Sequence, residues 1–248
     1  MVSVLTDPGK VGPLFGDWED TMITSCLQQV MGELYVTDPE CPDSVMAVLG
    51  DFAFLAGKPC RELAESKRSG FCILVPQNEA WEKIIQACFP GRCRRVTRYA
   101  IRKDTVFDRN RLLALKASLP AGCTLERIDE RLYDKCLESS WSRDLVSVFP
   151  SKESYLQQGL GIAAIENGQL VSGASSYSRY REGIEIEVDT RPDCRRRSLA
   201  TACSAALILT CLDAGLYPSW DAQNLWSVGL AQKLGYTFSH EYPAYEVE

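Results

Sequence analysis

The chain has 248 residues, of which 46% are hydrophobic and 24% charged, so it is long enough to bury a core as one large domain or two smaller ones. Its formal net charge of −6 disfavours nonspecific nucleic-acid binding and would suit a cationic partner. The most continuous apolar run, Leu199 to Leu212, is interrupted by polar residues and is shorter than the roughly 20 residues of a membrane span. We therefore expect a buried helix there and no membrane association.

The cysteines and the histidine restrict the chemistry further. Eleven cysteines are scattered without the paired spacings of a zinc site or the framework of a small secreted domain, and the N-terminus MVSVLTDPGK resembles no secretory signal. We expect reduced thiols, a cytoplasmic protein and no bound metal. A Ser-His-Asp or Cys-His arrangement would have to use the single histidine, His240. The simpler interpretation is that His240 is a surface or packing residue.

The first half of the chain alternates short apolar runs with helical patterns, in the order of an α/β unit. The expected elements are a helix at Trp18–Leu34, buried strands at Asp51–Ala56 and Phe71–Val75, a helix at Asn78–Phe89 capped by Asn78, and a strand at Arg95–Ile101. A helical run, Arg111–Ala117, then meets Pro120 and Gly122. This predicts an N-terminal α/β subdomain over residues 1–118 and a second domain over residues 119–248.

The second half has clearer signals. Asn167-Gly168 favours a type I′ turn between strands at Gly161–Ile165 and Leu170–Tyr177. Strict alternation from Ile184 to Asp189 predicts a half-buried strand with three aliphatic side chains on one face and three carboxylates on the other, solvated face. The other expected elements are helices at Glu130–Glu138, Lys152–Gln158, Ser198–Ala214 and Asn224–Leu234, and strands at Pro218–Asp221 and Tyr236–Glu246.

A basic turn connects the Ile184–Asp189 strand to the apolar helix. A helix N-terminus has unpaired amides and a partial positive charge, and here an arginine cluster precedes small residues that would let a phosphate approach: Arg195, Arg196, Arg197, then Ala200, Thr201 and Ser204. This pattern favours a pyrophosphate site. A capped core helix whose arginines face water explains the same residues.

Two motifs at this point resemble the GNAT superfamily of N-acyltransferases. Arg195-Arg196-Arg197-Ser198-Leu199-Ala200 is similar to the family's Arg/Gln-x-x-Gly-x-Gly/Ala motif, with Ser198 in place of a glycine; serine can also cap a helix. Downstream, Asn224-x-x-Ser227 followed by Lys233-Leu234-Gly235-Tyr236 is similar to a second family motif. The resemblance covers about the last 130 residues, and the N-terminal extension looks like the two-part type of the zwittermicin-resistance acetyltransferases.

The resemblance implies an α/β (α+β) fold, in which a mixed, mostly antiparallel sheet is flanked by helices and splayed between the Ile184 and Pro218 strands. It implies acetyl-CoA as acyl donor, direct attack of a small primary amine on the thioester, and a cytoplasmic enzyme. The cofactor-binding positions that it indicates are Val188, Asp189, Thr190, Arg195, Arg196, Arg197, Ser198, Leu199, Ala200, Thr201, Asn224 and Ser227.

Acyl transfer to an amine needs a group that takes a proton, since an alkylamine is mostly protonated at pH 7. Glu187 is the first candidate for this base and Glu185 the second, although both could simply form the wet face of a strand. By resemblance, the Val188 N–H would serve the oxyanion. The tyrosine that commonly protonates the thiolate in this family is replaced by Ala231, which leaves Ser227, Tyr236 or Tyr242 as candidate acids.

Two other functions stay open. Loss of the usual glycine and tyrosine is consistent with a non-catalytic domain that binds acyl-CoA or senses a ligand. A basic stretch interleaved with aromatics could track a nucleic acid, although a solvated strand face explains it equally well; its members are Arg92, Arg94, Arg95, Arg98, Arg102, Lys103, Arg109 and Arg111. The sequence also leaves open a homodimer, the acceptor and the acyl chain.

Overall fold

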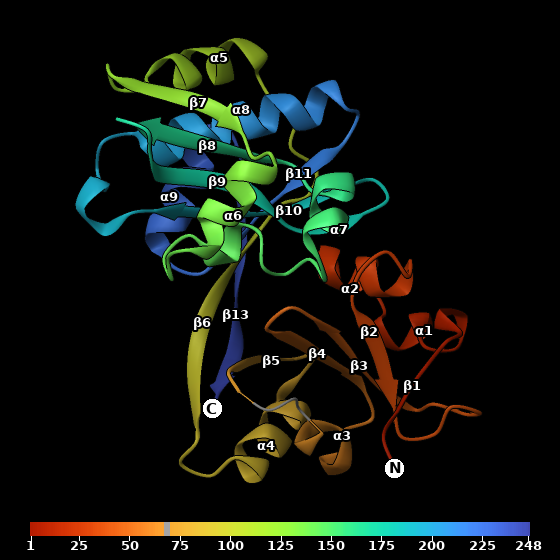
Figure 1. Ribbon diagram of the computed structural model, residues 1–248. Helices are drawn as coiled ribbons and strands as arrows, with labels where there is room; N and C mark the ends of the chain where they lie inside the picture. The colour runs from red at the N-terminus through yellow and green to blue at the C-terminus, as the bar shows by residue number, and fades with distance from the viewer. Residues whose placement is uncertain (67–69) are drawn as a thin grey trace. The chain divides into compact units, whose positions relative to one another are not determined.

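A computed structural model describes residues 1–66 and 70–248 (Figure 1). The chain forms two compact units: unit 1 contains Met1–Arg98 and Glu241–Glu248, and unit 2 contains Tyr99–His240. Two neighbouring strands, β6 (Cys93–Ile101) and β13 (Phe238–Val247), contribute residues to both units. The predicted fold class, mixed α/β with mostly antiparallel sheets flanked by helices, is confirmed.

Unit 1 is built on a sheet with the order β1-β2-β3-β4-β5-β13-β6, in which β4 and β5 are parallel. Its strands are β1 (Ser3–Val4), β2 (Glu33–Val36), β3 (Ser44–Leu49), β4 (Phe52–Gly57) and β5 (Cys72–Pro76), and its helices are η1 (Pro8–Lys10), α1 (Gly12–Phe15), α2 (Thr21–Leu27), α3 (Arg61–Glu65) and α4 (Glu79–Cys88). Trp81 and Ile85 of α4 pack against Leu55 and Leu74 of the sheet. Asn78 caps α4, as predicted, by accepting from the amides of Ala80 and Trp81.

One prediction in this unit was wrong, and strand β3 was not predicted. The helix predicted over Trp18–Leu34 is only α2, because the chain turns at Gln29 and Gly32, where φ is 56° and 81°. A Cβ at Gly32 would lie 2.5 Å from the Val48 carbonyl oxygen, so the close approach of this turn to β3 requires glycine. Strand β3 was missed since both of its faces are buried, and it therefore shows no alternation.

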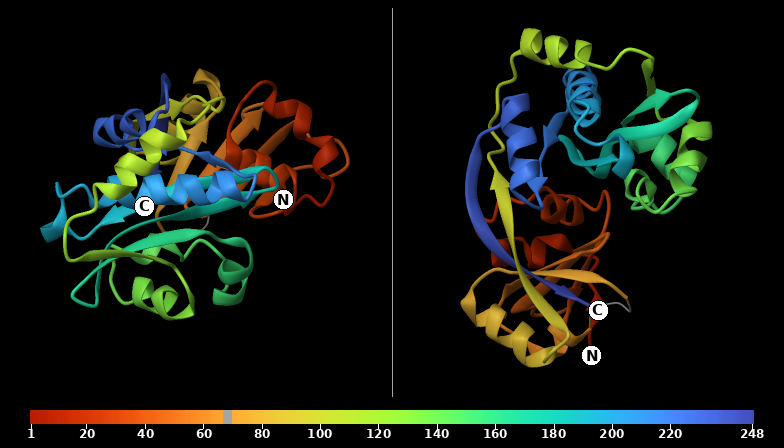
Figure 2. Two further views of the ribbon diagram at one scale, coloured as in Figure 1. Left: turned by 90° about the horizontal axis from the view of Figure 1, so that it is seen from above. Right: turned by 90° about the vertical axis from the view of Figure 1, so that its left-hand side faces the viewer.

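Unit 2 contains a five-stranded sheet with the order β11-β10-β9-β8-β7. Its strands are β7 (Cys123–Arg127), β8 (Gly161–Glu166), β9 (Gln169–Tyr180), β10 (Gly183–Thr190) and β11 (Tyr217–Ser219). Its helices are α5 (Arg109–Ala117), α6 (Glu130–Leu137), η2 (Arg143–Leu145), α7 (Lys152–Gln158), η3 (Pro192–Cys194), α8 (Leu199–Asp213) and α9 (Leu225–Leu234). Helices α5 and α8 lie over one face of this sheet and α6 and α7 over the other (Figure 2).

The predicted hairpin, the Ile184 strand and the long apolar helix are confirmed as β8–β9, β10 and α8. Asn167 and Gly168 have φ values of 50° and 76°, as a type I′ turn requires. Strand β7 was missed, because its five residues are only partly buried and carry little apolar signal.

The sheet opens beside β10. Strand β11 pairs with β10 in parallel only from Gly183 to Glu185, and the next strand, β12 (Asp221–Ala222), pairs instead with Tyr99 and Ala100 of β6. A register shift between Glu185 and Ile186 against β9 marks the same point. The splay that the GNAT resemblance implied is therefore present, and it begins after residue 185.

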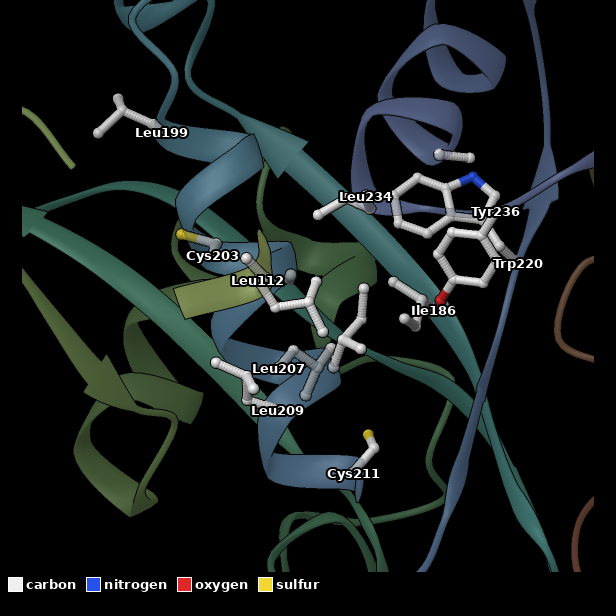
Figure 3. Packing of buried hydrophobic residues seen from close by; sticks show 14 of the residues in the cluster. Leu112, Ile186, Leu199, Cys203, Leu207, Leu209, Cys211, Trp220, Leu234 and Tyr236 are labelled. Carbon is white, nitrogen blue, oxygen red and sulfur yellow. The ribbon is translucent and has the colours of Figure 1, made fainter. Parts of the chain in front are cut away.

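The core of unit 2 lies between the sheet and α8. Ile186, Leu207, Trp220 and Tyr236 belong to one buried cluster, and Figure 3 shows their side chains packed together with other residues of α8 and α9. Because α8 is buried on almost all sides, its apolar run reads as continuous in the sequence. Among the described residues, no helix is long and apolar enough to cross a membrane.

The compact unit 2 begins at Tyr99, whereas the sequence predicted a boundary between residues 118 and 119. Helix α5 precedes that boundary but packs on α8, and its Leu112 is fully buried in the unit 2 core. Ile101 of β6 lies in the same core. The Pro and Gly signals at residues 120–122 therefore mark the end of a helix and the start of β7 within unit 2.

Candidate functional site

The open edge of β10 presents backbone groups that pair with no strand among the described residues. Arg191 N donates to Val171 O at 3.0 Å, and this bond fixes the register of the β9–β10 ladder. The backbone N–H and C=O groups of odd-numbered β10 residues therefore bond to β9, and those of even-numbered residues point to the other side. Among residues 1–66 and 70–248, no strand lies on that other side beyond Glu185. The N–H of Val188 therefore points into the splay, where it donates to Glu187 Oε1 at 3.1 Å.

Glu187 lies on the face of the sheet that α7 covers. It stands directly opposite Ser175 of β9, and opposite residues of an antiparallel pair share a face. Ser175 bonds to the hydroxyl of Tyr155 from α7 at 2.8 Å. Glu187 is half-buried, and its carboxylate accepts from the Val188 amide at the edge of β10.

Glu185 is in a different environment from the solvated one predicted. It is only 4% exposed, and Nζ of Lys103 lies 3.8 Å from its Oε2. The same ammonium donates to Ser219 Oγ at 2.7 Å and to Trp220 O at 3.3 Å. Lys103 thus connects β10 to the end of β11 where the strands separate, and the prediction of a wholly solvated carboxylate face was wrong at Glu185.

Asp189, the third carboxylate of β10, is followed by Thr190. Burial, and to a smaller extent the charge of Asp144, raise the pKa of Asp189 to about 6, while Arg195 acts in the opposite direction. Ser172 Oγ donates to the Asp189 carbonyl at 2.9 Å and lies 2.7 Å from Thr190 Oγ1. These bonds hold the end of β10 on β9 immediately before the basic turn.

The basic turn has a left-handed backbone at two positions. Ser198, which replaces the motif glycine, has φ 63° and ψ 8°, and Arg196 has φ 61°. Both values are in the left-handed region that favours glycine. Serine can cap a helix, but in the part of the chain that the structure describes the Ser198 side chain makes no capping bond. Within residues 1–66 and 70–248, the first-turn amides of Leu199, Ala200 and Thr201 have no acceptor.

The arginines of the turn have different environments. Arg197 donates twice to the Glu166 carboxylate, at 3.0 and 2.5 Å, and this pairing raises the Arg197 pKa. Arg195 donates from Nε to Thr190 O at a long 3.4 Å, whereas Arg196 is exposed. Arg195 and Arg196 are therefore available to a bound anion, while Arg197 ties the turn to the β8–β9 hairpin.

The second motif begins α9. Asn224 caps this helix by accepting from Ser227 N at 3.0 Å, and Ser227 Oγ accepts from Trp220 Nε1 at 3.0 Å. Tyr236 is 4% exposed, and its hydroxyl donates to the Pro218 carbonyl at 2.6 Å. Burial raises the pKa of Tyr236 well above its ordinary value. The Tyr236 hydroxyl is thus bonded inside the core, which is a poor position for a group that delivers a proton to a leaving thiolate.

The basic stretch that suggested nucleic-acid binding contacts acidic, carbonyl and aromatic groups of the chain itself. Its ion pairs and contacts are Arg94–Glu246, Arg95–Glu82, Arg102–Asp104, Lys103–Glu185, Arg109–Asp213, Arg111 with the Gln232 carbonyl, Arg92 over Phe89 and Arg98 over Phe52. These contacts account for the composition of the stretch. His240 is exposed and bonds to the adjacent Ser239 at 3.0 Å.

Sequence reasoning missed two residues that shape the site, Lys103 and Glu166. Lys103 was grouped with the surrounding basic residues, and only the tertiary structure brings it to Glu185. Glu166 ends a hairpin strand, and its position beside a turn offered no sign that it pairs with Arg197. The described residues contain no group of three or more His, Cys, Asp or Glu side chains arranged to hold a metal ion.

A family model also matches the chain that forms this splayed strand and turn. The model of the GNAT acetyltransferase family matches residues 12–245. The chain belongs to this family. It is therefore a GNAT-type acyltransferase enzyme, and the match extends through the N-terminal half, well beyond the last 130 residues in which the sequence motifs lie.

Other GNAT proteins resemble this chain over most of its length. An uncharacterised N-acetyltransferase, YdfB of Bacillus subtilis (strain 168), is 25% identical over 244 residues, which cover 91% of this chain and 89% of that protein. A GCN5-related N-acetyltransferase-like protein from Streptococcus suis 89/1591 is 48% identical, with a TM-score of 0.94 and 98% of each chain covered. A putative GNAT acetyltransferase from Novosphingobium aromaticivorans DSM 12444 shares the fold alone, at 17% identity and a TM-score of 0.54 over 87% of this chain and 88% of that one.

Proposed function

We propose that this enzyme transfers the acetyl group of acetyl-CoA to a primary amine of a small acceptor. The observation that carries the proposal is the open edge of β10, which leads through the basic turn into α8, a helix whose first-turn amides have no acceptor in the described structure. A hydrogen-bonding strand edge suits the amides of a pantetheine arm. Open amides at a helix N-terminus suit a pyrophosphate.

The donor site in this proposal extends from Val188 to Thr201. The amides of Ser198 to Thr201 face the pyrophosphate, and the exposed guanidiniums of Arg195 and Arg196 neutralise it. The left-handed Ser198 keeps the turn open in place of the usual glycine. Arg197 and Thr190 act indirectly, because their side chains hold the turn to Glu166 and Ser172.

The proposed chemistry uses two neighbouring residues of β10. Acetyl-CoA supplies an activated acyl group. Glu187 takes the proton of the acceptor ammonium from the α7 side of the sheet, and the Val188 N–H stabilises charge that develops on the thioester oxygen. Glu185 is a weaker candidate base because it is buried beside the Lys103 ammonium. Cleavage of the C–S bond releases the thiolate of coenzyme A, which can leave without an acid because the ordinary pKa of a thiol is near 8.5. This suits a site in which Ala231 replaces the motif tyrosine.

The test combines binding with turnover. Calorimetry should detect acetyl-CoA binding, and release of free coenzyme A should occur with at least one member of a panel of primary amines. The Arg195→Gln and Arg196→Gln variants should weaken binding and flatten its salt dependence, whereas Lys135→Gln, in α6 on the opposite face of the sheet from α8, should not. Absence of acetyl-CoA binding would exclude the proposed donor.

A second candidate function is a domain that binds acyl-CoA without transferring it. Ala231 in place of the usual tyrosine, together with the bonded hydroxyl of Tyr236, favours it. Tight coenzyme A binding with no release on any amine between pH 6 and 10 would support this alternative and contradict transfer.

A further inference from the structure

The carboxylate of Glu187 accepts the hydrogen bond of the Val188 N–H, the same donor that the thioester oxygen would use. Oε1 lies 3.1 Å from Val188 N, which is a hydrogen-bond distance. The contact joins adjacent residues, so it needs no movement of the strand to form or break. A single N–H cannot make a full-strength bond to this carboxylate and to a substrate carbonyl at once.

In the described part of the chain, the strand geometry gives this amide no partner in a neighbouring strand. The even-numbered residues of β10 point away from β9, and pairing with β11 ends at Glu185. Val188 is half-buried, with its side chain packed against the unit 2 core. Without a ligand, Glu187 therefore satisfies a donor that would otherwise depend on water.

We propose that Glu187 is a placeholder for the thioester oxygen: its carboxylate holds the Val188 N–H in the free enzyme and is displaced when an acyl-CoA binds. This inference rests on the proposed function. Displacement turns the carboxylate away from the strand edge and toward the acceptor amine whose proton it takes. Binding of the acyl group and release of the base are then one event, and free coenzyme A, which has no thioester carbonyl, does not cause it.

The proposal predicts a selective effect on affinity. Acetyl-CoA must displace a charged acceptor and coenzyme A need not, so removing the carboxylate should favour acetyl-CoA alone. In Glu187→Ala, the ratio of the coenzyme A dissociation constant to that of acetyl-CoA should rise about tenfold over the parent. In Glu187→Gln the rise should be smaller, because the amide oxygen still accepts the N–H, although as a weaker, neutral acceptor.

The Val188 amide provides a direct readout without turnover. Its proton resonance should move upfield in Glu187→Ala, and a non-hydrolysable ketone analogue of acetyl-CoA should restore the downfield position whereas coenzyme A should not. The control is Glu153→Ala, which removes an exposed carboxylate of α7 and should change neither the affinity ratio nor the resonance.

An unchanged affinity ratio in Glu187→Ala, or a Val188 amide resonance that does not move on this substitution, would overturn the placeholder proposal. Neither result would contradict the proposal of acetyl transfer. Failure of the parent to bind either form of coenzyme A would instead refute the proposed function. In that case the Val188 resonance of the free protein would still report whether the Glu187 contact exists, so the two failures are distinguishable.

Discussion

Ser198 occupies a position where the family usually has glycine, and its backbone adopts the glycine conformation nonetheless. The left-handed conformation costs a residue with a Cβ about 1–2 kcal/mol, and glycine loses part of that advantage through the entropy of the unfolded chain. Ser198→Gly should therefore raise the free energy of unfolding by up to about 1 kcal/mol and retain coenzyme A affinity, as measured by urea denaturation and calorimetry.

The opposite substitution provides the control. Valine is β-branched and tolerates the left-handed region poorly, so Ser198→Val should lower the free energy of unfolding by about 2 kcal/mol. It should weaken coenzyme A binding roughly tenfold, because the turn must be reshaped before the first-turn amides face the ligand. Equal affinity in Ser198→Val and the parent would show that the turn does not hold the pyrophosphate.

Asp189 should make folding depend on pH. Its folded-state pKa is raised from 3.8 to about 6, chiefly by burial, so the folded chain holds the proton more tightly than the unfolded chain does. Stability is therefore highest when Asp189 is protonated, and it falls as pH rises from about 4 through 6. Asp189→Asn should remove this loss and stabilise the protein at pH 7 by about 2 kcal/mol, after allowance for partial exposure.

Chemical denaturation at pH 4 and pH 7 measures the effect of Asp189→Asn. Asp193→Asn is a matched control, since the bond to Arg191 lowers the pKa of Asp193 and gives its pH dependence the opposite sign. A gain from Asp189→Asn that is the same at both pH values would contradict the raised pKa.

At the scale of elements, Lys103 fixes the point where β10 and β11 separate. The side chains of Lys103 and Glu185 are only 21% and 6% exposed, so Lys103→Met should leave a buried carboxylate without its ammonium. The free energy of unfolding should fall by about 3 kcal/mol. The double variant with Glu185→Gln should recover at least half of this loss in urea denaturation. An additive double variant would mean that the pair is not coupled.

The sequence predicted best those elements whose signals are local. The β8–β9 hairpin followed from Asn167-Gly168, and β10 followed from strict alternation. Helix α8 followed from a long apolar run that ends at Gly215. Strand β3 was missed because burial on both faces removes the alternation, and α2 was overextended because nothing local requires a turn at Gln29. The left-handed turn at residues 196–198 could be anticipated only from the motif. The partners of Glu185 and Arg197 depend on contacts between distant segments, which no local pattern encodes.

At the scale of the whole chain, the sequence and the contacts place the start of the C-terminal unit at different residues. A fragment of residues 119–248, cut at the sequence boundary, lacks Ile101 and Leu112, which are 2% and 0% exposed within the unit 2 core. Burial of such side chains contributes about 1.5–3 kcal/mol each. Removing α5 also uncovers part of α8, whose surface is almost entirely apolar.

A fragment of residues 99–248 keeps both residues and the whole of α5. We therefore expect it to unfold at a higher urea concentration than the 119–248 fragment and to bind less of a dye that reports exposed apolar surface. In the full chain, Leu112→Ala should lower the free energy of unfolding by about 2–5 kcal/mol, since it leaves a cavity beside α8. If the shorter fragment were as stable as the longer one, α5 would be a dispensable cover, and the boundary at residues 118–119 would describe an independently folding domain.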